Sequence, residues 1–326
     1  MSEVQIENGG DIDWWSILSD RTFLENPYPE LRRLQALGPV HLDKSNGIYF
    51  ILGHKAFSRA AKSSALGRDT RHWTNGWNTD DYRAHDPVGY RLFSEFQPQM
   101  INNDGDIHRR MRKVYEPAFR AQAMTSMVSL IEEEATALLK AMPDKGEVDF
   151  IEAFAGPLPL RVLCKLFDIP KSLDETIARW SASLIRIGDI LMTPEQKVEA
   201  LEALGEFKAF LREQISARQN RDEDNLMGLA IQAYKDGTLD EEETLTNLVS
   251  MLVAGHETTS GALSFALYFL ARHPEIADRA RAEIADVWGE QQRPDFELIA
   301  KLRYVRRVFD EALRLHPGLQ LLAVER

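Results

Sequence analysis

Apolar and polar positions alternate along most of the chain with the period of an amphipathic α-helix. That spacing gathers the apolar side chains on one face, where they can be buried against another element. Gly38 and Pro39 mark the end of the first such segment. The apolar positions that define the expected helices are Leu31, Leu34 and Leu37; Met127, Leu130, Ile131 and Leu138; Leu160, Leu163 and Phe167; Val198, Leu201, Leu204, Phe207, Leu211 and Ile215; Ile276, Ile284 and Trp288; and Leu302, Val305, Phe309 and Leu313.

Two regions depart from the helical period. The segments VHLD (40–43) and IYFIL (48–52) favour strands, and KSNG between them is typical of a hairpin turn. The stretch from Leu66 to Asn103 mixes turn residues with aromatic residues and is interpreted as a long loop, a kind of segment that often carries function. Because no repeat or linker divides the chain, residues 1–326 are predicted to form a single mainly α domain with a small N-terminal β element.

The central segment LVSMLVAGHETTSGALSFALYFLARHP (248–274) is apolar at both ends but polar on every face around AGHETT (254–259). A threonine hydroxyl inside a helix can bond the carbonyl four residues back. We therefore expect Thr258 to bond Ala254 and Thr259 to bond Gly255, with a bend in the helix at this point.

Gly255 has no side chain and is expected to leave a notch beside the bend. Glu257 flanks that notch, and a hydroxyl next to a carboxylate can hold a small polar molecule and pass protons to it. The other interpretation is a kink filled by ordered water, and these six residues alone favour neither. His256 and Glu257 begin like a zinc-protease HExxH motif, but Ser260 occupies the place of the second histidine, so no metal site is expected.

Composition and charge limit the class of protein. A chain of 326 residues, 44% of them hydrophobic, can bury a large core. Its net charge of −12 disfavours nucleic acid and anionic membranes as partners. Cys164 is the single cysteine, which excludes an internal disulfide and a CxxC-type zinc site. The acidic N-terminus has no basic region before an apolar run, so we expect no signal peptide and a cytoplasmic protein.

Three motifs carry a resemblance to a known family. AGHETT (254–259) resembles the oxygen-binding motif (A/G)-G-x-(D/E)-T-(T/S) in the long central helix of cytochrome P450 haem-thiolate monooxygenases. HRRMR (108–112) resembles the family's H-x-x-x-R segment, and EALR (311–314) resembles its E-x-x-R helix. Their order and separations extend the resemblance over nearly the whole chain, and it implies the bacterial, soluble type of the fold.

The resemblance implies roles for the central helix. Ala254 and Gly255 are expected to lie against the cofactor, haem b. Glu257 and Thr258 are the expected catalytic residues, which would deliver protons to the distal oxygen so that the O–O bond breaks productively.

His108 and Arg112 are implied to bind the haem propionates, and their spacing places both on one helical face. Without the resemblance, HRRMRK would be read as a solvated basic run. Glu311 and Arg314 could likewise be an ordinary surface ion pair. In the family that pair is buried and holds the fold around the cofactor.

One part of the family pattern is not present. The family carries its iron-ligating cysteine in a loop after the E-x-x-R helix, and this sequence stops at Arg326. Cys164 lies on the apolar stripe of PLPLRVLCKLFDIP, so we expect it to be a buried structural residue. The expectation is a cytochrome P450 fold that is incomplete at its C-terminus, and a chain that is inactive as given.

The complete enzyme implied by the resemblance inserts one atom of O2 into a small apolar substrate. Its electrons would come from a ferredoxin or flavodoxin, for which HRRMRK offers a basic docking patch. Two other classes stay open. The chain could be a non-catalytic protein that binds an apolar ligand without ligated haem, or an incompletely folded helical remnant.

Overall fold

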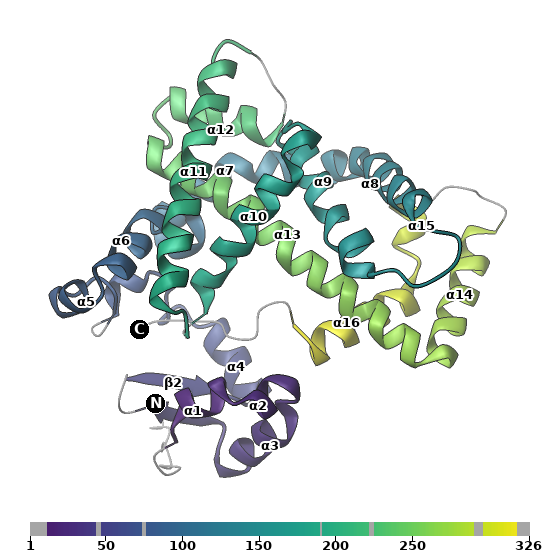
Figure 1. Ribbon diagram of the computed structural model, residues 1–326, viewed down its shortest axis with the longest axis horizontal. Coiled ribbons are helices and arrows are strands. Elements are labelled where there is room, and N and C mark those ends of the chain that lie inside the picture. The colour runs from purple at the N-terminus through teal and green to yellow at the C-terminus, as the bar shows by residue number, and fades with distance from the viewer. Residues whose placement is uncertain are drawn as a thin grey trace.

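The computed structural model describes residues 12–43, 47–73, 76–189, 191–221, 225–289 and 296–317. This part of the chain is mainly helical and contains one two-stranded sheet, which confirms the predicted class. Figure 1 shows a small N-terminal part that carries the sheet, and a larger helical body crossed by one long helix, α13. The prediction that both belong to a single domain stays a prediction.

The helices and strands follow the expected pattern along most of the chain. Their bounds are α1 Trp14–Ser19, α2 Arg21–Glu25, α3 Tyr28–Leu37, β1 Val40–Asp43, β2 Ile48–Ile51, α4 His54–Ala61, α5 Asp80–His85, α6 Pro87–Phe96, α7 Gly105–Tyr115, α8 Ala121–Ala141, α9 Pro157–Leu166, α10 Asp174–Leu184, α11 Pro194–Arg218, α12 Leu226–Lys235, α13 Glu241–Arg272, α14 Pro274–Trp288, α15 Phe296–Ile299 and α16 Arg303–Leu315.

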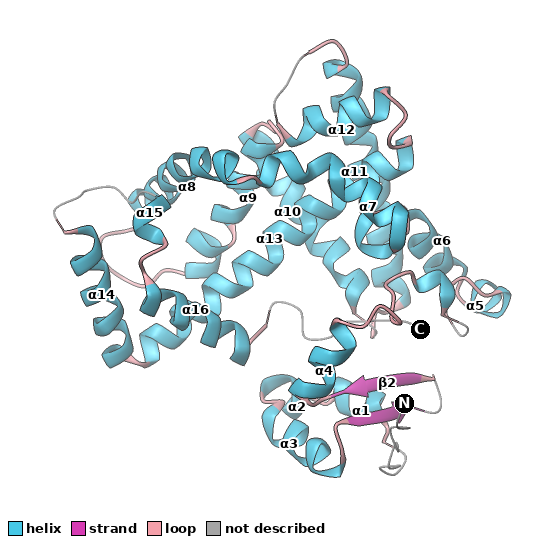
Figure 2. Ribbon diagram, turned by 180° about the vertical axis from the view of Figure 1, so that it is seen from behind, coloured by secondary structure: helices cyan, strands magenta, loops and turns pink. Residues whose placement is uncertain are grey.

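The N-terminal part has a core of its own. Strands β1 and β2 pair antiparallel, and Figure 2 shows them beside α1 to α4. Trp14 of α1 stacks on Phe50 of β2, with ring centroids 3.8 Å apart, and both pack with buried Leu34 of α3. Residues 44–46 of the predicted KSNG turn lie outside the described residues.

The helical body is organised around the N-terminal half of α13. Leu245, Leu248, Val249 and Leu252 are fully buried in one core cluster with residues of α9, α10, α11 and α12. Burial on several sides explains why this stretch of the sequence is apolar around most of the helix, and not on one stripe only. The helix begins at a capping box in which Asp240 is the N-cap residue.

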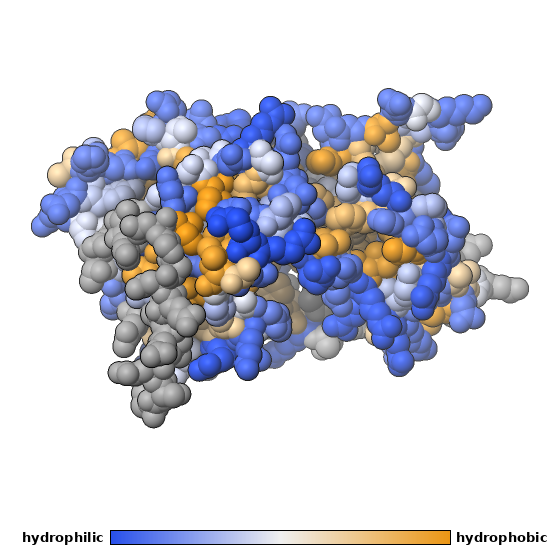
Figure 3. All heavy atoms as spheres, turned by 90° about the horizontal axis from the view of Figure 1, so that it is seen from below, coloured by the Kyte–Doolittle hydropathy of each residue, from blue (hydrophilic) through white to orange (hydrophobic). Residues whose placement is uncertain are grey.

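The C-terminal half of α13 is less covered. It packs against α14 and α16, but Phe265, Leu267 and Tyr268 remain 37%, 39% and 51% exposed. Figure 3 shows hydrophobic residues between polar ones, and a hollow, on the face of the molecule seen from below. The change from a buried to a partly open helix falls at the polar segment AGHETT.

The long loop expected from Leu66 to Asn103 was wrong, because this stretch contains α5 and α6. Thr79 caps α5 through its hydroxyl, and Asp86 caps α6 through its carboxylate, with Pro87 as the first helical residue. The abundant turn residues are therefore helix caps. The aromatic side chains are spaced so that they pack on one another between the two short helices.

Candidate functional site

The polar segment AGHETT lies in the middle of α13, and the helix runs through it without interruption. The Thr258 hydroxyl donates a 2.7 Å hydrogen bond to the carbonyl oxygen of Ala254, which confirms the first predicted back-bond. Ala254 is exposed and Thr258 is half-buried, so their shared face is left open by the described neighbours. Thr259 is exposed as well, and among the described residues it makes no bond to Gly255.

Gly255 faces helix α9 and not the open side. A Cβ atom at this position would lie 3.0 Å from Cδ1 and 3.2 Å from Cδ2 of Leu163. The notch expected beside Gly255 is therefore filled by a leucine side chain. The glycine lets α9 and α13 approach closely, and the open surface near it belongs to Ala254 and Thr258.

His256 lies on the buried side of α13, opposite Ala254 and Thr258, and Glu257 lies between that side and the open face. The His256 side chain is 8% exposed and the Glu257 side chain is 30% exposed, with Nδ1 and Oε1 3.4 Å apart. Burial lowers the pKa of His256 below its usual value, while the Glu257 charge and the backbone of Gly156 act in the opposite direction. Nδ1 of His256 is buried and has no hydrogen-bond partner among the residues that the structure describes.

Helix α7 carries His108 and Arg112 on one face, as their spacing predicts. His108 is half-buried and Arg112 is exposed. The Arg112 guanidinium lies 3.7 Å from the Glu116 carboxylate, a weak pairing at the surface. Both side chains are thus available to an anionic ligand.

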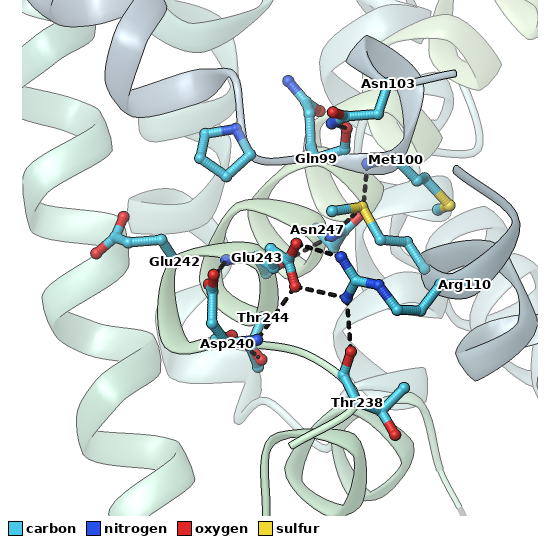
Figure 4. A network of polar contacts seen from close by, with 12 residues as sticks. Gln99, Met100, Asn103, Arg110, Thr238, Asp240, Glu242, Glu243, Thr244 and Asn247 are labelled. Atoms are coloured by element: carbon cyan, nitrogen blue, oxygen red, sulfur yellow. Dashed lines mark hydrogen bonds and ion pairs between the residues drawn. The ribbon is translucent and has the colours of Figure 1, made fainter. Parts of the chain in front are cut away.

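The residue between them, Arg110, holds α7 against the start of α13, a contact that the sequence analysis missed. Figure 4 shows its guanidinium bound to both carboxylate oxygens of Glu243, at 2.6 and 2.7 Å, and to the carbonyl oxygen of Thr238 at 2.6 Å. The Arg110 hydrogen bond holds the pKa of the Glu243 carboxyl below its usual range. Glu243 also accepts from the Asp240 backbone N–H, so the capping box and the ion pair share one carboxylate.

A second missed contact fixes the segment that precedes α7. The Asn247 side chain, fully buried on α13, accepts a 2.9 Å hydrogen bond from the Met100 backbone N–H and donates one of 2.6 Å to the Glu243 carbonyl. The Thr246 hydroxyl bonds the carbonyl of Pro98. Buried polar side chains in a long apolar helix were the available signal, since such groups need partners.

Glu311 and Arg314 of α16 form a bidentate ion pair with both bonds 2.7 Å long. Their side chains are 56% and 63% exposed in the described part of the chain, so the burial implied by the resemblance was wrong for this structure. The neighbouring Leu315 carbonyl accepts a hydrogen bond from the Tyr28 hydroxyl of α3. That bond joins α16 to the N-terminal part.

Cys164 is a buried core residue, as expected. It is 2% exposed, and burial raises the pKa of its thiol to about 12. The thiol is therefore neutral near pH 7. Within the described residues, no group of three or more His, Cys, Asp or Glu side chains could hold a metal ion, and no helix is long and apolar enough to cross a membrane.

A surface pocket lies where α5 and α6 meet the start of α11, in the region predicted to cover the substrate. Asp86 accepts from the Tyr82 hydroxyl at 3.0 Å and from Lys197 Nζ at 2.5 Å. Val88 and Val198 add apolar surface to its lining. The aromatic residues above it pack on each other, with 6.1 Å between the rings of Trp77 and Tyr90.

Comparison with known proteins identifies relatives of this chain. The family model "Cytochrome P450" matches residues 188–326. A cytochrome P450 of Bacillus subtilis is 26% identical over 313 residues, which cover 95% of this chain and 70% of that protein. The cytochrome P450 monooxygenase PikC of Streptomyces venezuelae is 28% identical over 270 residues, which cover 80% of this chain and 60% of PikC.

Solved structures share the fold. The structure of P450BioI in complex with an acyl carrier protein ligated to hexadec-9Z-enoic acid superposes with a TM-score of 0.74 at 23% identity, over 90% of this chain and 69% of that one. Because the chain spans 60–70% of the length of these proteins, their activities do not transfer to it directly.

The Arg110–Glu243 pair leads to a stability prediction. Glu243→Gln removes the charge and should lower the free energy of unfolding by about 1–2 kcal/mol at pH 7, measured by urea denaturation. The folded-state pKa of Glu243 is depressed, so this contribution is present above the unfolded value of about 4.3 and is lost as pH falls through the folded pKa. Parent and variant should therefore converge only after the pH has fallen through the depressed folded pKa of Glu243.

Glu311→Gln is the matched control, because it breaks a bidentate pair of the same type at the surface. It should leave the free energy of unfolding unchanged within error at every pH. Equal effects of the two substitutions would contradict the structural role assigned to Glu243.

Proposed function

Because the chain belongs to the cytochrome P450 family, we propose that it forms part of a haem-dependent monooxygenase that inserts one atom of O2 into a small apolar substrate. The observation that carries the proposal is the open Ala254–Thr258 face of α13. A hydroxyl and an uncovered small residue stand there side by side on an otherwise apolar helix. A helix that only filled a core would be apolar or covered at this point.

The described residues fit two parts of a haem. Ala254 presents a flat, open position on which a planar ring can lie, with Gly255 behind it against α9. His108 and Arg112 present donors from one face of α7, suited to the two propionates. When bound, the haem would supply the activation of O2 and the oxidising power for insertion.

The chain's own contribution is to hold and move protons at Thr258. Its hydroxyl hydrogen is committed to the Ala254 carbonyl, so the Thr258 oxygen is left with free acceptor capacity. Glu257 is next in the relay, because its carboxylate is 30% exposed and can exchange protons with solvent.

Cys164 does not fit the iron-ligand position. A thiolate is the ligand in this family, whereas the Cys164 thiol is buried in the core and neutral. We therefore propose that the 326 residues by themselves do not carry out oxygenation. The same observation favours the second candidate function, in which this chain binds an apolar ligand without ligated haem.

Substrate class and electron donor are proposed from surface chemistry. The pocket beside α5 and α6 has an apolar lining that includes Val88 and Val198, which suits a small apolar compound. One relative, 28% identical over 78% of this chain, is named vitamin D(3) 25-hydroxylase, from Pseudonocardia autotrophica, and its name states a hydroxylation. Arg109 and Lys113 are exposed on α7 and would face an acidic ferredoxin or flavodoxin in the cytoplasm.

The first prediction for this proposed function concerns the 326-residue chain by itself. Titrated with haem and followed by absorbance and circular dichroism, it should bind haem weakly or not at all, keep a high helix content, and show no monooxygenase activity. A stoichiometric complex with the thiolate-type carbon monoxide difference band would contradict this proposal. Haem without that band would favour the ligand-binding candidate.

The second prediction tests the propionate donors in a chimaera that joins residues 1–326 to the haem-ligand region of a bacterial relative. Replacing His108 and Arg112 with Gln should weaken haem binding about tenfold, since charge-assisted hydrogen bonds are lost. Arg109→Gln is the control, because Arg109 is exposed on the same helix and pairs with Asp106. If both variants lose haem affinity equally, His108 and Arg112 do not bind the propionates and belong to a solvated basic surface.

The third prediction tests the relay in the same chimaera. Thr258→Ala should leave haem content intact and divert reducing equivalents from product to hydrogen peroxide, because the hydroxyl that places the proton is gone. Thr259→Ala is the matched control, as the adjacent exposed threonine lies off the proposed face. Product formed per electron consumed is the measurement. A Thr258→Ala variant that is as well coupled as the parent would exclude the relay role.

A further inference from the structure

His256 makes a contact that the proton relay does not use. Its ring is buried, and Nδ1 has no hydrogen-bond partner within the described residues. Oε1 of Glu257 lies 3.4 Å from Nδ1. That separation is too long for a strong hydrogen bond but shortens readily if a proton lies between the two atoms.

Two groups that favour N–H donors lie beside this ring, the Glu257 carboxylate and the backbone of Gly156. A neutral imidazole has one N–H, whereas an imidazolium has two. The neutral ring therefore cannot satisfy both acceptors, and the charged ring can. Burial opposes the charged form, so the protonation state of the ring is set by a balance between desolvation and the two acceptors.

We propose that His256 is a positioning residue for Glu257: the protonated ring holds the carboxylate against the buried side of α13, and the neutral ring releases it to exchange protons beside Thr258. The inference rests on the proposed relay function of Glu257. It adds that pH controls the position of the Glu257 carboxylate through the protonation of His256. Near pH 7 the ring is neutral, because burial lowers the pKa of His256. Acidification below that range would switch the carboxylate to the held position.

The charged side chains of α9, the helix that packs against this part of α13, have partners of their own. On α9, Arg161 pairs with Asp174 at 3.4 Å and Lys165 pairs with Glu134 at 3.9 Å. The remaining ionisable groups on α9 and on the turn before it are Cys164, whose thiol is neutral, and Glu152, which is exposed. Ser260, the buried hydroxyl one turn along α13, carries no charge.

The chain contains a matched pair for comparison. His273 Nδ1 and Glu275 Oε1 are also 3.4 Å apart, but these side chains are 52% and 70% exposed. Solvent screens such a contact, so removing the glutamate charge there should have little effect on the histidine. The two pairs have the same distance and differ in burial.

The test is nuclear magnetic resonance of the 326-residue chain with 15N-labelled histidine, which needs no haem. Glu257→Gln should lower the titration midpoint of His256, because the carboxylate is the charge that raises it. Glu275→Gln should move the His273 curve by less than half of that. Equal small changes in the two variants would overturn the proposal.

A second pair of variants separates positioning from a structural role. In the parent, the Glu257 side-chain 13C signal should show an additional inflection at the His256 midpoint. His256→Asn places a non-titrating N–H near the position of Nδ1, so the carboxylate should stay held and the inflection should disappear. His256→Leu removes the donor, so the Glu257 side-chain signal should differ from the one in His256→Asn.

These outcomes are distinguishable from failure of the proposed function. The Glu257 signal could show the His256 inflection while Thr258→Ala leaves the product formed per electron unchanged. That result would support the His256–Glu257 contact and exclude the relay role. An inflection that persists in His256→Asn would overturn the positioning role, whatever the chimaera does. Circular dichroism of each variant confirms that the fold is retained, and Glu257→Gln, at a partly exposed side chain, is the least disruptive of them.

Discussion

The close approach of α9 to α13 at Gly255 is the contact on which the site depends. Leu163 fills the space that a side chain at position 255 would need. Its side chain therefore packs directly against the backbone of α13. The same approach buries His256 on one side of α13 and leaves Ala254 and Thr258 uncovered on another. One steric constraint thus divides AGHETT into a packed side and an open side.

Charged contacts at the start of α13 place the surrounding helices. Arg110 ties α7 to Glu243, and the buried Lys208 Nζ of α11 bonds both Glu242, at 2.6 Å, and the Glu95 carbonyl of α6, at 2.8 Å. Carboxylates in the first turn are also favoured by the helix dipole. Because these groups are partly desolvated and share partners, they orient three helices about one helix end, which isolated surface pairs do not do.

The motifs indicated which residues matter but not which way they face. Thr258 was predicted correctly because its bond to Ala254 is set by the helix itself. The notch at Gly255 was predicted wrongly, because the residue that fills it comes from another helix. For Glu311 and Arg314 the i, i+3 spacing predicted the ion pair, while burial depended on elements that spacing does not describe.

The sequence by itself determined the helical class, the strand pair, the back-bond of Thr258 and the shared face of His108 and Arg112. Each follows from the backbone period or from residues at most four positions apart. Tertiary structure alone decided the Arg110–Glu243 contact and the buried side of AGHETT, whereas the helices in the expected loop have local cap signals that were misread as turns. The first two depend on groups more than a hundred residues apart, or on which face another helix covers, and no period along the chain encodes that.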